Sequence, residues 1–341
     1  MKAIAKRDIG IDLLRVFAIF GVLIIHTCSY DALIGSSNWY GSLFWGSLSR
    51  ASVPLFLMVS GAMMLSKDYT IKKLFTKNIL RILIAMFFWA ILYKAFHLHM
   101  DSNLTKDTFL HGIKEVFLFN QEFHFYYLHM ILIVYLFLPI TRIIVKNATK
   151  RQMQYLLGVW FFLAIVLPTA MPYKPLSMMG IRGMWPIGIT YASIGYGILG
   201  YYIKKPPMPR LISIIMILAG FSVIFFGTSY MSQKYNMLYE HFLSGTGIGA
   251  FTMAVGIFGF LSRVYVKNKG IEKTAIGVSM ASFLVYLVHV FFLVMMKEVG
   301  ITVGFCPYVI SIPVLSLVNL TASLVVYAIL SRIPVLRNWV I

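Results

Sequence analysis

The sequence is poor in charged residues, which make up 12% of its 341 positions, whereas 60% are hydrophobic. An average soluble domain carries about twice that share of charge, so the scarcity excludes an ordinary soluble fold. In lipid a backbone must satisfy its own hydrogen bonds, and only helices or a closed barrel do so. The apolar runs are long and do not alternate, which favours helices. We therefore predict an all-α, polytopic membrane protein embedded in a lipid bilayer.

Runs long enough to span a membrane recur along the whole chain. A hydrocarbon core of about 30 Å needs roughly 20 apolar residues, and we count about ten such runs. They cover residues 11–30, 43–65, 78–97, 123–145, 153–171, 183–203, 210–229, 242–262, 276–296 and 307–330. No linker rich in Gly, Ser or Pro and no internal repeat divides them. We expect a single membrane domain over residues 1–341.

Acidic residues are also scarce, with 11 Asp and Glu against 30 Lys and Arg. In a soluble protein the net charge of +19 would suggest nucleic acid, but here the cations gather in alternate connections between the runs. That bias is typical of cytoplasmic loops. It predicts that both termini are cytoplasmic and that nucleic acid is not a partner. The cations include Lys67, Lys72, Lys73, Lys146, Lys150, Arg151, Lys204, Lys205, Lys267 and Lys269.

Cysteine is nearly absent, and the spacings that bind metals are missing. Cys28 and Cys306 fall near predicted outer helix ends, where we expect inert apolar fillers rather than a disulfide. His124 and His129 are five positions apart, about 140° around a helix, and no HExxH motif occurs. We therefore expect no metal site.

Two polar residues interrupt the first apolar run. The eleven positions from Arg15 to His26 turn a helix about 20° past three full turns and rise about 16 Å, so both side chains share one face. A charge within a span is costly, which makes a functional role the first hypothesis. The alternatives are a snorkelling arginine and a core histidine. Asp12, three positions before Arg15, is expected to hold its guanidinium. No cleavage site follows, so we expect an uncleaved helix.

Further cations lie at two predicted depths. Arg50 is about 10 Å below the outer end of the second run, close to the depth of His26. It could stabilise a developing negative charge or hold an anionic substrate group. Lys77 and Arg81 begin the third run, level with Arg15. This inner layer suits the phosphates of a cytoplasmic cofactor, although ordinary positive-inside charge is the alternative.

Three sequence elements resemble those of the acyltransferase family 3 membrane proteins, bacterial enzymes that O-acylate surface glycans. The first is the pair Arg15 and His26. The second runs from Arg50 through Pro54 to Gly61, and the third is Ser282-Phe-Leu-Val-Tyr-Leu-Val-His289. The chain departs from the family pattern at Asn78, where many members have arginine, and in Phe125-Tyr-Tyr-Leu128, where tryptophan is common.

The resemblance implies an O-acetyltransferase of the bacterial cytoplasmic membrane. Acetyl-CoA or another acyl-CoA would bind Arg15, Lys77 and Arg81, while His26 and Arg50 carry out the transfer. A glycan or other envelope acceptor would meet the remaining candidates, which are His124, Glu240, Tyr286 and His289. His26 could act as a general base or carry the acyl group itself. Homo-oligomerisation is left open. The rival functions are transport or flipping of a glycan or lipid-linked precursor, and a membrane sensor that binds a ligand without chemistry.

Overall fold

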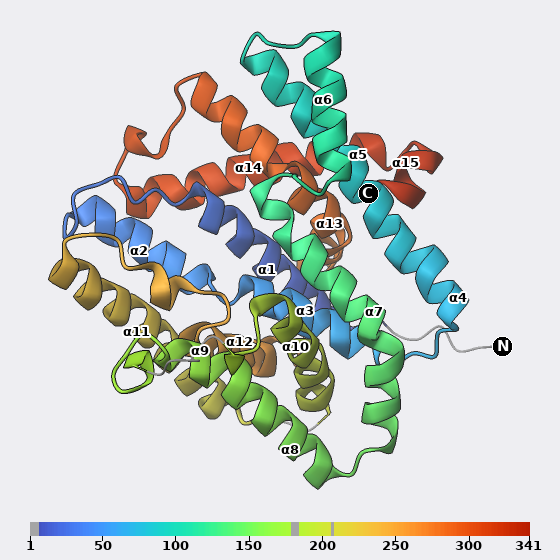
Figure 1. The fold of residues 1–341 in the computed structure, drawn as a ribbon, viewed down its shortest axis with the longest axis vertical. Coiled ribbons are helices and arrows are strands. Elements are labelled where there is room, and N and C mark those ends of the chain that lie inside the picture. The colour runs from blue at the N-terminus through green and yellow to red at the C-terminus, as the bar shows by residue number, and fades with distance from the viewer. Residues whose placement is uncertain (1–6, 179–183, 206–207) are drawn as a thin grey trace.

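The structure, a computed structural model, describes residues 7–178, 184–205 and 208–341. Every regular element in these ranges is a helix, which confirms the all-α prediction. The helices form one bundle in which α1 (Ile9–Thr27) runs through the centre (Figure 1). It packs against α3, α13 and α14. The first helix of the sequence is therefore the core of the fold.

Within the described ranges, nine helical segments are long and apolar enough to cross a membrane. Several of them combine consecutive helices. They are α1; α2 (Ser37–Ser49) with α3 (Ser52–Met64); α4 (Ile71–Leu74), η1 (Phe75–Ile79) and α5 (Leu80–Met100); η2 (Phe123–Phe125) with α7 (Tyr126–Asn147); α8 (Lys150–Phe161), η3 (Phe162–Val166) and α9 (Leu167–Ala170); α11 (Arg210–Tyr235); η6 (Glu240–Leu243) with α12 (Ile248–Leu261); α13 (Lys269–Glu298); and α14 (Tyr308–Leu330).

The remaining predicted run, 183–203, starts in a segment outside the described residues. Its described part contains α10 (Ile189–Lys204), which has 16 residues and a helical rise of about 24 Å. This helix is shorter than a typical span, and its small residues pack against α3 and α7. A Cβ added at Gly61 of α3 would meet the carbonyl oxygen of Gly197 at 1.9 Å, so only glycine permits this close approach.

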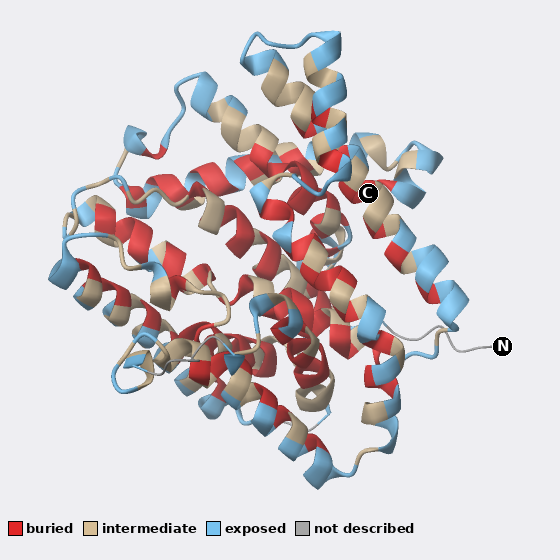
Figure 2. Ribbon diagram, viewed as in Figure 1, coloured by how far each residue is buried: buried red, intermediate tan, exposed pale blue. Residues whose placement is uncertain are grey.

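Short helices complete the fold. Between α5 and α7, α6 (Lys106–Phe117) packs against α5 at the edge of the bundle (Figure 1). Figure 2 shows buried residues gathered in the central helices and exposed ones on α6 and the outer helix ends. The others are η4 (Leu176–Met178), η7 (Val303–Phe305) and α15 (Pro334–Trp339).

The second span is broken between α2 and α3, at Arg50 and Ala51. Pro54 accounts for the position, because it cannot donate a hydrogen bond to the carbonyl of residue 50 and its ring would clash with that carbonyl in a continuous helix. The break lies four residues before the proline, so that Arg50 lies at the joint.

Candidate active site

A cavity of about 280 Å³ opens between α1, α3, α5, α7 and α13. It lies at the end of the bundle where α1 and α5 begin, which the charge pattern predicts to be cytoplasmic. Three cations, Arg15, Lys77 and Arg81, line it together. The cavity therefore brings together the residues that the sequence assigned to an inner cationic layer. Its hydroxyl-bearing lining residues are Ser60, Tyr127, Tyr135, Ser279, Ser282 and Tyr286.

No Asp or Glu side chain of the described ranges forms an ion pair with Arg15, Lys77 or Arg81. Nη2 of Arg15 donates to Sδ of Met63 at 3.1 Å, and Nη2 of Arg81 donates to the main-chain oxygen of Ile341. A site that keeps its positive charge in a low-dielectric setting favours an anionic ligand.

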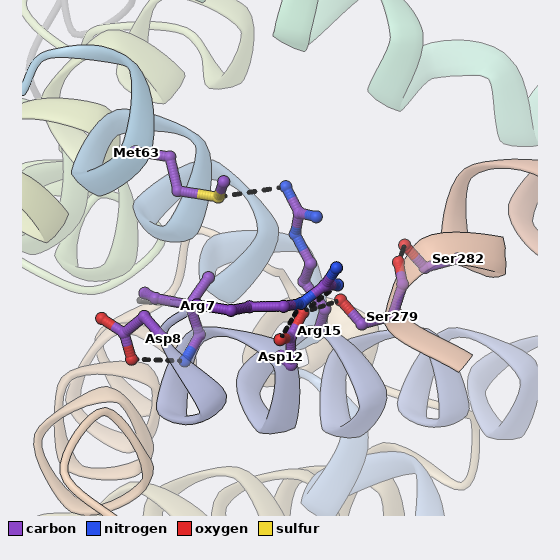
Figure 3. A network of polar contacts seen from close by, with 8 residues as sticks. Arg7, Asp8, Asp12, Arg15, Met63, Ser279 and Ser282 are labelled. Atoms are coloured by element: carbon purple, nitrogen blue, oxygen red, sulfur yellow. Dashed lines mark hydrogen bonds and ion pairs between the residues drawn. The ribbon is translucent and has the colours of Figure 1, made fainter. Parts of the chain in front are cut away.

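Asp12 does not hold Arg15, contrary to the expectation from the sequence. Its carboxylate forms a forked pair with Arg7, whose Nε and Nη2 lie 2.7 and 2.9 Å from the two oxygens (Figure 3). The hydroxyl of Ser279 on α13 donates to the same carboxylate at 2.6 Å. The guanidinium fork matches a carboxylate and uses both of its oxygens. Arg15 instead turns toward α3 and Met63 (Figure 3).

A cluster of three imidazoles lies farther along α1. The ring of His26 is 5.0 Å from that of His289 and 6.4 Å from that of His124, and the last two are 5.2 Å apart. His124 and His289 are fully buried. Both ring nitrogens of His124 and Nε2 of His289 lack a hydrogen-bond partner among the described residues. Unpaired buried polar atoms are rare and call for a function.

Hydrogen bonds fix the orientation of His289. Its Nδ1 lies 2.7 Å from the carbonyl oxygen of Tyr286, and because a carbonyl can only accept, Nδ1 carries the proton. Nε2 then has a free lone pair in the cluster. Asn319 of α14 donates to the carbonyl oxygen of His289 at 3.0 Å and accepts from Ser323. These hydrogen bonds from α14 fix the α13 backbone at His289.

Tyr286 connects the cavity to the histidine cluster. Its side chain lines the cavity, and its hydroxyl donates to the carbonyl oxygen of His124. One tyrosine therefore contacts both regions.

Within the described residues, no group of His, Cys, Asp and Glu side chains could hold a metal ion. The absence of a metal site remains a prediction.

Arg50 lies beside this cluster. Its charge acts electrostatically on His26, Tyr30 and Tyr126, and its Nε is buried with no hydrogen-bond partner in the described part of the chain. Burial raises the pKa of the Tyr30 phenol to about 12, so that hydroxyl stays protonated at neutral pH. Glu240 is exposed in η6 and acts on Tyr30.

The structure adds two residues that the sequence did not single out, Ser279 and Phe123. Ser279 joins Ser282, Tyr286 and His289 in one stripe along α13, with spacings of three, four and three residues. That helical period in an otherwise apolar run is a signal that could have identified Ser279. The exposed ring of Phe123 packs edge-on against His26 at 5.4 Å, and no local pattern predicts that contact.

Comparison with known proteins identifies the family. The model of acyltransferase family 3, described as an acyltransferase domain, matches residues 8–328, which is nearly the whole chain. No curated protein and no solved structure matches the sequence. The match agrees with the resemblance drawn from Arg15, His26 and the elements around Arg50 and His289. The chain therefore belongs to acyltransferase family 3 and is a multi-pass membrane acyltransferase.

Proposed function

We propose that the protein is an O-acetyltransferase of the bacterial cytoplasmic membrane, which takes an acetyl group from cytoplasmic acetyl-CoA and passes it to a hydroxyl of an envelope glycan. The observation that carries this proposal is the connection, through Tyr286, of a cavity lined by three cations to a buried histidine cluster. A donor with phosphates at one end and a thioester at the other suits this arrangement. Since the family is one of acyltransferases, the transporter and sensor alternatives lose support.

Donor binding is assigned to the cavity. The phosphates of CoA would meet Arg15, Lys77 and Arg81, and the pantetheine arm would extend past Tyr286 toward the outer half of α1. The helical rise of about 16 Å between Arg15 and His26 is comparable to the reach of that arm. The neutral partner of Arg15, the Met63 sulfur, supports this assignment, because phosphate binding would not first have to break an ion pair at that residue.

The transfer step is assigned to the histidine cluster. As the oxygen of the acceptor hydroxyl attacks the thioester carbon, His26 accepts the hydroxyl proton. Arg50 opposes the negative charge that develops on the carbonyl oxygen. The carbon–sulfur bond then breaks, and the proton passes from His26 to the CoA thiolate. In a second route a ring nitrogen of His26 attacks the thioester carbon first, the carbon–sulfur bond breaks, and CoA leaves as the thiolate. The acceptor oxygen then attacks the acetyl carbon on His26, the carbon–nitrogen bond breaks, and the hydroxyl proton passes to the thiolate.

The test uses the purified full chain in liposomes with acetyl-CoA labelled in the acetyl carbon. Glycan-bearing envelope extract is supplied on one side and the donor on the other. We expect label in the glycan fraction for the wild type and for His129→Gln, whose histidine lies on α7 against Phe119 and outside the cluster. We expect His26→Gln to transfer label about 10²–10⁴ times more slowly, because it lacks the general base. Label in that variant at the wild-type rate would contradict the role of His26, and no label from the wild type would contradict the function.

A further inference from the structure

Two buried hydrogen-bond donors lie close together beside the histidine cluster. The hydroxyl of Tyr30 and Nε of Arg50 have no hydrogen-bond partner of normal geometry among the described residues. The guanidinium is still close enough to act on the hydroxyl through its charge and as a donor. A phenol that accepts from a guanidinium keeps its own proton to donate. Because unpaired buried polar groups are rare, the two donors call for an acceptor atom that a ligand brings.

Gly46 of α2 makes room for the Tyr30 hydroxyl. A Cβ added at Gly46 would collide with the hydroxyl oxygen, whereas it would lie 3.4 Å from Cζ of the same ring. Gly46 is four positions before Arg50, which is about one helical turn earlier on the same face of α2. The close approach at this glycine therefore places the hydroxyl on the face of α2 that carries Arg50.

Hydrogen bonds hold the chain on both sides of Tyr30. Oγ of Ser42 in α2 donates to the carbonyl oxygen of Ser29, and Oγ of Ser29 donates to the carboxylate of Asp31 at 2.6 Å. The hydroxyl of Tyr308 in α14 donates to the same carboxylate at 3.2 Å. The segment between α1 and α2 is therefore tied to two helices. Donors fixed in this way need little reorganisation when negative charge develops beside them.

The position of Arg50 connects this donor pair to the transfer step. Its charge acts on Tyr30 on one side and on His26, the proposed base, on the other. We propose that Tyr30 is a second catalytic donor, which together with Arg50 holds the carbonyl oxygen of the thioester as negative charge develops on it. This role rests on the proposed function, in which the donor substrate is an acyl-CoA.

The step leaves both protein donors unchanged. As the acceptor oxygen attacks the thioester carbon, one electron pair of the carbon–oxygen double bond moves onto the carbonyl oxygen. Tyr30 and Arg50 donate hydrogen bonds to that oxygen and keep their protons. When the carbon–sulfur bond breaks, the electron pair returns to the carbon–oxygen bond and the sulfur leaves with the bonding pair. The donors act most strongly when the oxygen is charged, so they favour the transition state over the bound thioester.

The test uses the full chain in liposomes with labelled acetyl-CoA and envelope extract. Tyr30→Phe removes the hydroxyl and keeps the ring. Gly46→Ala keeps the hydroxyl and displaces it, while in the double variant the added methyl group meets a ring carbon at an ordinary contact distance. Tyr196→Phe is the matched control. The hydroxyl of Tyr196 is also buried without a partner in the described residues, and its ring packs against Trp160.

We expect Tyr30→Phe to lower kcat about 10²-fold, a loss typical of removing one oxyanion donor. The dissociation constant for acetyl-CoA and the amount of extract that gives half the maximal rate should stay within about twofold, because the charge develops only in the transition state. Gly46→Ala should also lower kcat. The double variant should be no slower than Tyr30→Phe, since the hydroxyl that the methyl group displaces is gone. Tyr196→Phe should match the wild type.

A need for more extract at unchanged kcat would mean that Tyr30 holds the acceptor, and weaker acetyl-CoA binding at unchanged kcat would mean that it acts only on the bound donor. Either result overturns the proposal, as does a double variant in which the two losses multiply. Should Gly46→Ala fail to fold, Tyr30→Phe decides alone. Transfer by Tyr30→Phe at the wild-type rate overturns this role and leaves the proposed function standing, whereas a wild type without transfer overturns both.

Discussion

The cationic cavity and the histidine cluster are both polar regions inside an apolar bundle, but they are built differently. The cavity is open enough for a ligand, and Arg15 in it has a neutral partner, the sulfur of Met63. The cluster is tightly packed, and ring nitrogens of His124 and His289 have no partner in the described chain. A guanidinium keeps its charge, whereas an imidazole can exchange a proton near neutral pH. We therefore expect the donor to bind in the cavity and the transfer to take place in the cluster, at two positions along α1.

The strongest test of this separation is to remove the chemistry and keep the binding. His26→Gln should lower kcat by about 10²–10⁴, the usual contribution of a general base, and leave the affinity for acetyl-CoA unchanged. Turnover and equilibrium binding by calorimetry, measured on the same preparation, give the two numbers. His129→Gln controls for loss of an imidazole elsewhere on the outer side. A matched fall in affinity and kcat would mean that the two regions are not separate.

The converse test acts on the cavity. Arg15→Gln should raise KM for acetyl-CoA by about 10- to 100-fold, because it removes charge-assisted hydrogen bonds to phosphate, with a smaller effect on kcat. Initial rates over a range of donor concentrations measure both constants. The exposed Arg332 offers a control for lost positive charge, as Arg332→Gln. An unchanged KM in Arg15→Gln would remove this residue from the donor site.

Tyr286 tests whether the two regions communicate. Tyr286→Phe keeps the ring in the cavity wall and removes the hydrogen bond to the carbonyl oxygen of His124. We expect kcat to fall about fivefold, equivalent to about 1 kcal/mol for one neutral hydrogen bond, with KM unchanged. Tyr196→Phe is the control, because that buried hydroxyl has no hydrogen-bond partner in the described residues. A change in KM alone would place Tyr286 with the cavity and not between the regions.

The sequence predicted those features that depend on local period and composition. Apolar runs identified the spans, and the spacing of Arg15 and His26 placed one at the cavity and the other in the cluster. Contacts between distant segments were not predictable. Nothing near Arg81 indicates that its partner is Ile341, 260 positions later. Glu240 is exposed in η6, and its place in the acceptor site stays a prediction.

The smallest expected effect on activity concerns Asp12, where local spacing suggested the wrong partner. Asp12→Asn should lower the free energy of unfolding by about 1–2 kcal/mol, since it weakens the charge-assisted bonds to Arg7. KM for acetyl-CoA should stay within about twofold of wild type, because Arg15 bonds to Met63 and does not depend on this carboxylate. Thermal unfolding in detergent and donor kinetics measure the two effects. A tenfold rise in KM would instead mean that Asp12 orients Arg15 once the donor is bound. The Asp12–Arg7 ion pair would then contribute to donor binding and not only to stability.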